Sequence, residues 1–266
     1  MSHKDLTTQQ KYVRKHKREH HSITFWRIFL FVLFLLYWEV GAKCKWFDSF
    51  FFSSPSGILS CIKWLWTDFH LCRHISITLF ETCISFLCIM VLSLSIAILF
   101  WYHTKLAKIA EPYLVILNSL PKSALAPLFI VWFGTNQKTV IIAGISVGIF
   151  GSIMTFLTMF QQSDPEKYTL IQTFGGNKKD ILCKLLLPES VPGIINACKV
   201  NIGLALVGVI IGEFLSAKEG LGYLIIYGSQ IFRLDMVITG IIILCLIALG
   251  FYQILQTLEH SIKKHF

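Results

Sequence analysis

Long uncharged apolar runs constrain this chain more than any other feature. Residues 139–160 and 236–258 contain no charged side chain. A helix rises about 1.5 Å per residue, so roughly 20 apolar residues cross a hydrocarbon core of about 30 Å. The whole chain is 55% hydrophobic and only 15% charged, whereas soluble domains average about 25% charged residues. The sequence therefore predicts a membrane protein.

Four further runs are apolar enough to span a membrane, although each contains charge. They are residues 23–40, 75–102, 112–133 and 194–215. Arg27 and Glu39 lie near the ends of the first run, where long side chains reach the membrane interface. Residues 112–133 hold Lys122 between Pro121 and Pro127, and prolines interrupt helical hydrogen bonding. We predict an all-α membrane protein with six transmembrane helices, the third of them broken.

The distribution of lysine and arginine predicts the orientation of these spans. With the N-terminus inside, the cytoplasmic segments carry fourteen lysines and arginines and the outer segments carry seven. Cytoplasmic loops are enriched in these residues. We expect a multi-pass cell-membrane protein with both termini in the cytoplasm, a basic tail over 1–22 and a transmembrane domain over 23–262. The net charge of +9 then reflects topology, with membrane lipid rather than nucleic acid as the partner.

No pattern in the chain indicates catalysis. The eight cysteines include no CxxC pair, which favours small apolar side chains over metal ligands or disulfides. Neither HExxH nor a Walker A loop is present, and these are the patterns of zinc peptidases and nucleotide hydrolysis. We expect no catalytic residue, no metal site and no cofactor. If the protein moves a solute uphill, the energy must come from a partner.

One motif has two interpretations. Residues 144–148 match the GxSxG pattern of a serine hydrolase, which would make Ser146 a nucleophile. That pattern needs a strand, a sharp turn and a helix, yet here it lies inside an uncharged run. The same residues also form GxxxG, as do residues 208–212, and small residues at this spacing let transmembrane helices approach closely. We predict helix packing, with an intramembrane serine hydrolase as an alternative.

Charged side chains inside the spans are candidates for a translocation pathway. Each costs on the order of a few kcal/mol at the bilayer centre, so it should face protein or a water-filled path. Lys199 and Glu213 are 14 residues apart on one predicted helix, too far to pair; Glu213 lies near the outer end and either reaches the interface or faces the pathway. Lys122 lies at a predicted break, and broken helices line cavities or pack inside protein. We take Lys122, Lys199 and Glu213 as candidate pathway residues.

The segment 161–193 between two spans predicts a short helix followed by a turn. Ser163 or Asp164 is a suitable N-cap, and Pro165 suits the first helical position. Gly175 is a suitable stop, because glycine tolerates the positive φ of a helix end. We therefore predict a short helix within 163–174 that ends sharply.

A second short helix is predicted directly after it. Asn177 is a suitable N-cap, and Asp180 occupies the third helical position. Ile181, Leu182, Leu185 and Leu186 recur on one face, and we expect Pro188 to end the helix. The two helices would form a rigid hairpin; the alternative is a connector on the membrane surface.

The same segment resembles a known family. The spacing of Gly175, Leu185 and Leu187-Pro188 is similar to the EAA loop of binding-protein-dependent ABC transporter permeases. Residues 169–171, Thr-Leu-Ile, replace the family's Glu-Ala-Ala, and Leu185 replaces an isoleucine. The stretches "SLPKSALAPLFIVWFG" from Ser119 and "GEFLSAKEGLGYLI" from Gly212 resemble the branch with nitrate, sulfonate and taurine importers. The resemblance covers about residues 25–262.

This resemblance implies a type I ABC importer permease fold with a cytoplasmic coupling helix. It implies a second permease copy, a homodimer of ATP-binding subunits that hydrolyse ATP, and an extracytoplasmic solute-binding protein. The cargo would be a small anion such as nitrate, sulfonate or taurine, or a vitamin precursor such as a thiamine pyrimidine. An ion-coupled secondary carrier is the alternative. The residues implied in coupling are Thr169, Gly175, Gly176, Asp180, Leu187 and Pro188.

Overall fold

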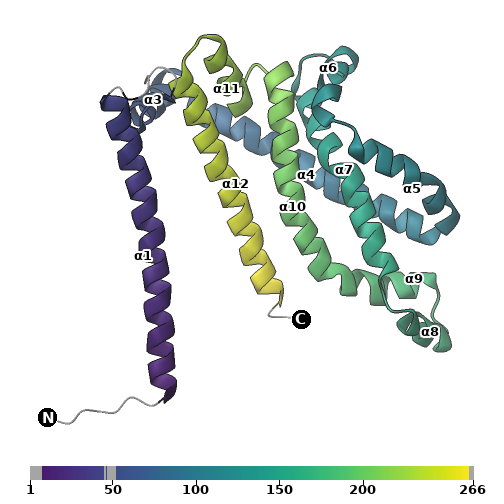
Figure 1. The fold of residues 1–266 in the computed structure, drawn as a ribbon. Coiled ribbons are helices and arrows are strands. Elements are labelled where there is room, and N and C mark those ends of the chain that lie inside the picture. The colour runs from purple at the N-terminus through teal and green to yellow at the C-terminus, as the bar shows by residue number, and fades with distance from the viewer. Residues whose placement is uncertain (1–7, 45, 47–51, 264–266) are drawn as a thin grey trace.

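The computed structural model describes residues 8–44, 46 and 52–263, and within these residues it contains helices and no strands. Figure 1 shows their arrangement. In chain order the elements are α1 (Thr8–Lys43), α3 (Pro55–Asp68), α4 (Leu71–Tyr102), α5 (Thr104–Ser119), α6 (Lys122–Phe133), α7 (Gln137–Gln161), α8 (Pro165–Thr173), α9 (Lys178–Ile181), the π-helix η1 (Leu182–Leu186), α10 (Leu187–Ser216), α11 (Leu221–Gln230) and α12 (Leu234–Lys263).

Five helical segments among the described residues are long and apolar enough to cross a membrane, and a bent pair raises the number to six. The predicted all-helical membrane fold is confirmed. All six runs expected from the sequence lie on these helices. The five segments are Ser22–Lys43, Leu71–Tyr102, Gln137–Gln161, Lys178–Ser216 and Leu234–Ser261.

The bent pair is α5 and α6, whose axes differ by 95°. The predicted break in the third span is present, and it lies at Leu120 and Pro121, between the two helices. The prediction that Pro127 also breaks the helix is wrong, because α6 continues through it. Pro112, expected at the start of the span, lies inside α5, which begins earlier at Thr104. Of the three prolines in this span, only Pro121 therefore lies at the break between α5 and α6.

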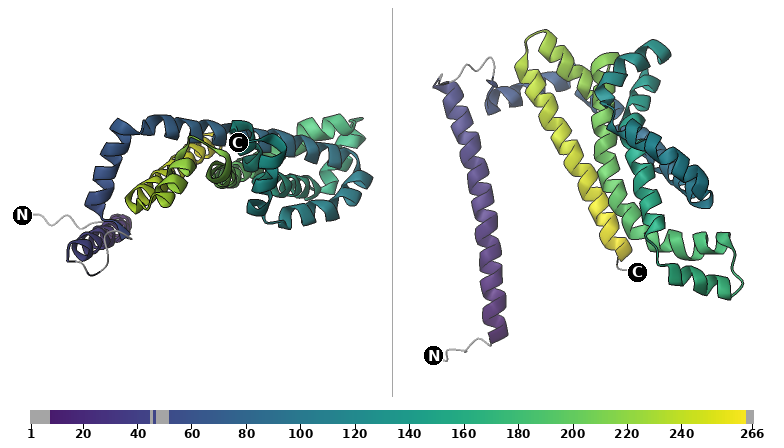
Figure 2. Two further views of the ribbon diagram at one scale, coloured as in Figure 1. Left: turned by 90° about the horizontal axis from the view of Figure 1, so that it is seen from above. Right: turned by 45° about the vertical axis from the view of Figure 1, so that its right-hand side comes forward.

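The helix ends gather at two ends of the molecule. The start of α1, the end of α12 and the α8–α9 region lie at one end, and α3, α6 and α11 lie at the other (Figures 1 and 2). We call these the α8 end and the α11 end. With the bent pair counted as one span, the chain crosses the membrane six times. An even number of crossings leaves the start of α1 and the end of α12 on the same side, as the structure places them.

The helices α4, α7 and α10 form the centre of the fold, and glycines bring two of their backbones into contact. A Cβ added to Gly208 of α10 would lie 2.8 Å from the Cα of Gly144 in α7, and one added to Gly212 would lie 2.9 Å from the Cα of Val140. A Cβ on Gly148 would meet Ile89 of α4 at 2.9 Å. The prediction that both GxxxG stretches pack helices together is confirmed.

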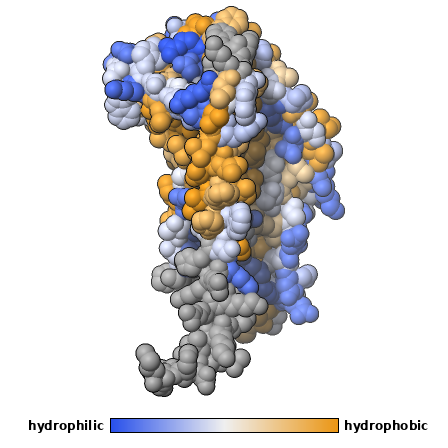
Figure 3. Space-filling view, turned by 60° about the vertical axis from the view of Figure 1, so that its left-hand side comes forward, coloured by the Kyte–Doolittle hydropathy of each residue, from blue (hydrophilic) through white to orange (hydrophobic). Residues whose placement is uncertain are grey.

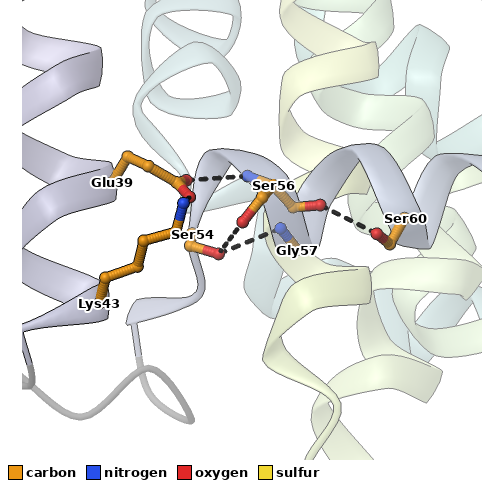
Figure 4. Close-up of polar contacts among 6 residues, drawn as sticks. All are labelled: Glu39, Lys43, Ser54, Ser56, Gly57 and Ser60. Carbon is orange, nitrogen blue, oxygen red and sulfur yellow. Dashed lines mark hydrogen bonds and ion pairs between the residues drawn. The ribbon is translucent and has the colours of Figure 1, made fainter.

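Helix α1 stands apart from this centre (Figures 1 and 2). Its apolar side chains are exposed along the spanning segment, and they form a hydrophobic band bounded by hydrophilic residues at the α11 end (Figure 3). Glu39 joins α1 to α3: it pairs with Lys43 at 2.9 Å and accepts from the backbone N–H of Ser56 at 3.1 Å (Figure 4). Ser54 caps α3 by accepting from the Gly57 N–H at 3.0 Å.

The described residues of the expected basic tail over 1–22 are helical. Residues 1–7 lie outside the described residues, but from Thr8 the chain is already helical and continues as α1 into the first span. The described tail is thus an extension of α1 rather than a separate segment. The spanning part begins at Ser22.

The close approach of α7 and α10 predicts that Gly208→Leu destabilises the fold. The added side chain would need to displace backbone, and overpacking a tight core typically costs about 1–3 kcal/mol. Gly250→Leu is the matched control, because no atom lies within 4 Å of a Cβ added to Gly250. Thermal melting of purified protein, followed by size-exclusion chromatography, should show a lower midpoint for Gly208→Leu alone. Equal midpoints would contradict the glycine contact.

Candidate functional site

The helix α8 is capped at its start by the residues that the sequence predicts. Asp164 accepts a hydrogen bond from the backbone N–H of Glu166 at 2.9 Å, and Pro165 is the first helical residue. Proline suits this position because the first N–H groups of a helix have no partner within it. The predicted short helix is therefore confirmed over Pro165–Thr173.

The end of α8 is fixed by two glycines for different reasons. The N–H of Gly175 bonds to Gln172 O and that of Gly176 to Ile171 O, both at 2.9 Å, which is the Schellman arrangement of a helix end. Gly175 has φ +79, and no atom lies within 4 Å of an added Cβ. Glycine is therefore needed at this position for its backbone conformation and not for space. A Cβ on Gly176 would lie 2.8 Å from the carbonyl oxygen of Ile171. Glycine is therefore needed at this position because there is no room for a side chain.

The next helix begins with the predicted capping box. Asn177 accepts from the N–H of Asp180 at 3.1 Å, and the Asp180 carboxylate accepts from the N–H of Asn177 at 3.0 Å. Asp180 also pairs with Lys184 at 2.7 Å. The helices on both sides of the glycine turn are thus capped by local hydrogen bonds. We call residues 163–188 the α8–α9 hairpin.

The prediction that Pro188 ends this second helix is wrong. The helix passes through the π-helix η1, where Leu187 N–H bonds to Leu182 O, and continues as α10 to Ser216. A proline has no N–H to donate and its ring displaces the carbonyl four residues earlier. The wider π turn accommodates Pro188 near the start of α10, and such turns are frequent at functional sites. The hairpin is therefore continuous with a span.

Ionic and hydroxyl contacts tie the start of α8 to the start of α10. The Glu189 carboxylate accepts from Lys167 Nζ and from Ser163 Oγ, each at 2.6 Å. The hydrogen bond to Glu189 raises the pKa of the Lys167 ammonium above its usual value. Tyr168 donates its hydroxyl to the carbonyl of Phe160 in α7 at 3.1 Å. Local sequence patterns do not indicate these contacts, because Glu189 lies 22 residues beyond Lys167.

The two faces of the hairpin differ in burial. Ile181, Leu182 and Leu186 are buried in one cluster with Phe156 and Phe160 of α7. The partly buried Leu185 and Leu187 pack against the same cluster, as the predicted apolar face requires. By contrast, two large apolar side chains of α8 and its C-cap are exposed: Leu170 is 58% exposed and Phe174 is 83% exposed. This exposed pair was not among the residues predicted from the sequence.

The six residues predicted for coupling all lie on the α8–α9 hairpin. Thr169 is exposed in the middle of α8, and its hydroxyl donates to the carbonyl of Pro165 at 3.2 Å. The glycine pair forms the turn, Asp180 caps α9, and Leu187 and Pro188 begin α10. The residues thus form one continuous structural unit at the α8 end.

Lys122 is the first residue of α6, and its ammonium donates back to the end of α5. Its Nζ lies 2.5 Å from Leu117 O, 2.8 Å from Asn118 O and 3.1 Å from Leu120 O. The last carbonyls of a helix have no partner within it, and a cation there is favourable. The ring of Phe150 lies 5.7 Å from Nζ. These contacts stabilise the bend between α5 and α6.

Lys199 lies on α10 and pairs with a different helix. Its ammonium forms an ion pair with Glu259 of α12, and both side chains are mostly buried. The ring of Tyr252 lies 5.7 Å from Lys199 Nζ. As expected, Lys199 does not pair with Glu213. Its contacts join α10 and α12.

Glu213 is completely buried, with 0% of its surface exposed. The interpretation that it reaches the interface is therefore wrong. Thr78 of α4 donates to its Oε1 at 2.7 Å, and the N–H of Gly222 in α11 donates to its Oε2 at 2.5 Å. Although Glu213 lies near the end of α10 in sequence, α11 folds back over it. A second carboxyl, that of Glu81, is also buried, one helical turn after Thr78 on α4, and no sequence pattern indicates it.

The three predicted pathway residues are not brought together. Lys122 holds the α5–α6 break, Lys199 joins α10 to α12, and Glu213 is enclosed by α4 and α11. Ser146, the alternative nucleophile, lies in the middle of α7 and donates to Ala143 O at 2.8 Å. The strand and turn of a hydrolase elbow are absent from this segment.

The contacts of Lys122 predict that Lys122→Met destabilises the α5–α6 bend while Lys122→Arg largely preserves it. Methionine cannot donate to the carbonyls at the end of α5, and a loss on the order of 1 kcal/mol is expected. Thermal melting of both variants checks this. An unchanged midpoint for the methionine variant would show that the ammonium does not stabilise the bend.

Comparison with known proteins identifies similar chains. The family model described as binding-protein-dependent transport system inner membrane component matches residues 89–264. A probable ABC transporter permease protein of Haemophilus influenzae is 26% identical over 230 residues, covering 85% of this chain and 91% of that protein. The formylaminopyrimidine transport permease protein ThiX of Halalkalibacterium halodurans is 24% identical over 193 residues, covering 73% and 76%. The putative aliphatic sulfonates transport permease protein SsuC of Bacillus subtilis is 25% identical over 212 residues, covering 79% and 76%.

Two solved structures share the arrangement of helices. A chain of the inward-facing MetNI methionine ABC transporter has a TM-score of 0.65 at 19% identity, covering 75% of this chain and 97% of its own. A chain of a bacterial ABC transporter that imports the acidic polysaccharide alginate has a TM-score of 0.62 at 17% identity, covering 95% and 99%. At these identities the likeness extends to the fold alone.

Proposed function

Because this chain belongs to the family of binding-protein-dependent transport system inner membrane components, we propose that its α8–α9 hairpin couples solute import to ATP hydrolysis in a separate subunit. The chain is a multi-pass permease subunit of an ABC importer, a transport subunit that works with a solute-binding protein. The hairpin would receive the movement of an ATP-binding homodimer, and two copies of the permease would enclose the pathway.

The observation that carries this proposal is that hydrogen bonds and an ion pair fix both ends of α8. Its start is capped by Asp164, its end is closed by the glycine pair, and Lys167 and Ser163 fix it to Glu189 of α10. A lever can transmit movement only if it does not deform under load. The exposed side chains of Leu170 and Phe174 are suited to an apolar groove on a partner, because exposed apolar residues that project together mark protein interfaces.

The proposed contact differs from the family pattern in charge. Thr169-Leu170-Ile171 stand where the family has Glu-Ala-Ala, so this α8 offers no acidic side chain at that place. We propose that Leu170 and Phe174 supply apolar contact there instead. The ATP-binding subunit that fits this chain would then present an apolar rather than a basic groove.

We propose that the α8 end faces the cytoplasm and the α11 end faces outward. The fourteen lysines and arginines in the segments assigned to the inside, against seven outside, support this orientation. Both termini then lie in the cytoplasm together with the hairpin, where ATP is available. The solute-binding protein would dock at the α11 end.

The cargo we propose is a small solute, of the class of the sulfonates and formylaminopyrimidine that appear in the names of two relatives. Lys122 and Lys199 are candidate pathway residues with positive charge. Their ammonium groups are engaged by carbonyls and by Glu259, respectively. We propose that both lysines line the pathway as structural supports, and that selection of the cargo rests mainly on the solute-binding protein.

Substitutions of Gly175 test the coupling proposal. Gly175→Val should abolish most uptake and copurification of the ATP-binding subunit, because a β-branched residue is strained at φ +79. Gly175→Asn is the matched control, because asparagine tolerates positive φ and the site has open space. Both variants should insert normally. Full uptake by a well-expressed Gly175→Val chain would refute the role of the turn.

Single cysteines in a cysteine-free background test the orientation. A membrane-impermeant maleimide should label Lys218→Cys in intact cells, and it should label Thr173→Cys only after the membrane is permeabilised. Both positions are exposed, so accessibility depends on the side of the membrane. The opposite pattern would reverse the proposed topology.

A further inference from the structure

Two buried carboxyl groups meet between α4 and α10. Glu81 is 1% exposed and Glu213 is 0% exposed. Glu81 lies one helical turn after Thr78 on α4, and Thr78 donates to the Glu213 carboxylate at 2.7 Å. Two ionised carboxylates placed this way would repel each other, whereas a protonated carboxyl can donate a hydrogen bond to an ionised one. The transport function described above assigns no role to this pair.

Glu213 is arranged as the ionised member. Its two oxygens accept from Thr78 Oγ at 2.7 Å and from the Gly222 N–H at 2.5 Å. Gly222 lies in the first turn of α11, where free N–H groups and the helix dipole favour a negative charge. The Leu221 N–H bonds in turn to Thr78 Oγ at 2.9 Å. These two hydrogen bonds and the helix dipole therefore stabilise a negative charge on the Glu213 carboxylate.

Glu81 has no such support. Its Oε2 is buried without a hydrogen-bond partner among the described residues, as is Oγ1 of the neighbouring Thr82. None of the described cations forms an ion pair with either carboxyl. A second buried negative charge beside the first would be both repelled and unsolvated.

The other titratable groups near the pair are engaged elsewhere or lie toward the surface. On α4, His74 Nδ1 faces the Gly220 N–H at 2.9 Å, and Arg73 pairs with Glu219 at 2.7 Å. A pocket of about 360 Å³ reaches Glu81, and Lys218 and Glu219 line it from the loop before α11. Helix α7 and the turn before it contribute the neutral Thr135, Asn136, Gln137 and Val140 to the pocket.

We propose that Glu81 and Glu213 bind one shared proton, with Glu81 as the acid and Glu213 as the carboxylate. This proton joins α4 to α10 beneath α11, and the pocket at the α11 end gives it access to water. Removing it would place two like charges in contact and separate the helices where α11 closes over them. The proposal rests on the packing of α4, α10 and α11 and does not depend on the proposed coupling function.

Infrared spectroscopy of the full-length chain in lipid nanodiscs tests this directly, since a protonated carboxylic acid has a C=O stretch that a carboxylate lacks. The wild-type protein should show this band at neutral pH, and Glu81→Gln should remove it. The amide keeps the shape and can donate to Glu213, so the variant should still fold. Glu219→Gln is the matched control, because that carboxyl is at the surface and paired with Arg73, and it should leave the band unchanged.

Isotope labelling keeps the test valid if Glu81→Gln fails to fold. Wild-type protein grown with carboxyl-¹³C-glutamate should show the same band shifted to lower frequency. Three results would overturn the proposal: no protonated band in wild-type protein, a band that survives Glu81→Gln, or a band that disappears on addition of sodium ions. The last result would indicate a metal cation in place of the proton.

Discussion

The backbone contact between α7 and α10 is the interaction on which the rest of this structure depends. Gly144 and Gly208 let the two helices touch without intervening side chains, and α4 packs across both. In lipid, association of helices relies on such close packing because the hydrocarbon solvent offers no hydrophobic driving force. The α8–α9 hairpin connects the end of α7 to the start of α10. It is therefore joined to two spans whose backbones are in contact, which suits the coupling role proposed for it.

Helix ends inside the fold are satisfied by side chains from distant elements. The last carbonyls of α5 accept from Lys122, and the first N–H groups of α11 are met by His74, Thr78 and Glu213. Broken helices at membrane depth are tolerated only where such groups find partners. Two of the charges within the spans, Lys122 and Glu213, thus bind helix ends, and Lys199 joins two helices. This explains why the predicted pathway residues are separated rather than clustered.

Local chemistry made part of the site predictable from sequence. Asp164, Gly175 and the Asn177–Asp180 box act within a few residues, so their roles follow from short-range capping rules. Pro188 was misread because the π turn that accommodates it depends on packing against α7. The burial of Glu213 was also missed, since its partner Thr78 is 135 residues away. The span positions followed from hydropathy, whereas α11, which folds over Glu213, was too short to be recognised.

The central claim is that α7, the α8–α9 hairpin and α10 move as one rigid body when ATP binds. Spin labels at Thr173 and Lys218 of one chain, diluted with unlabelled permease in the assembled transporter, measure this by pulsed electron resonance. The account predicts the same intrachain distance with and without ATP in this sample. In a second, undiluted sample labelled at Thr173 alone, the distance between the labels of the two copies should change. An intrachain distance that changes on ATP binding would show that the hairpin moves independently of α10 and would contradict the account.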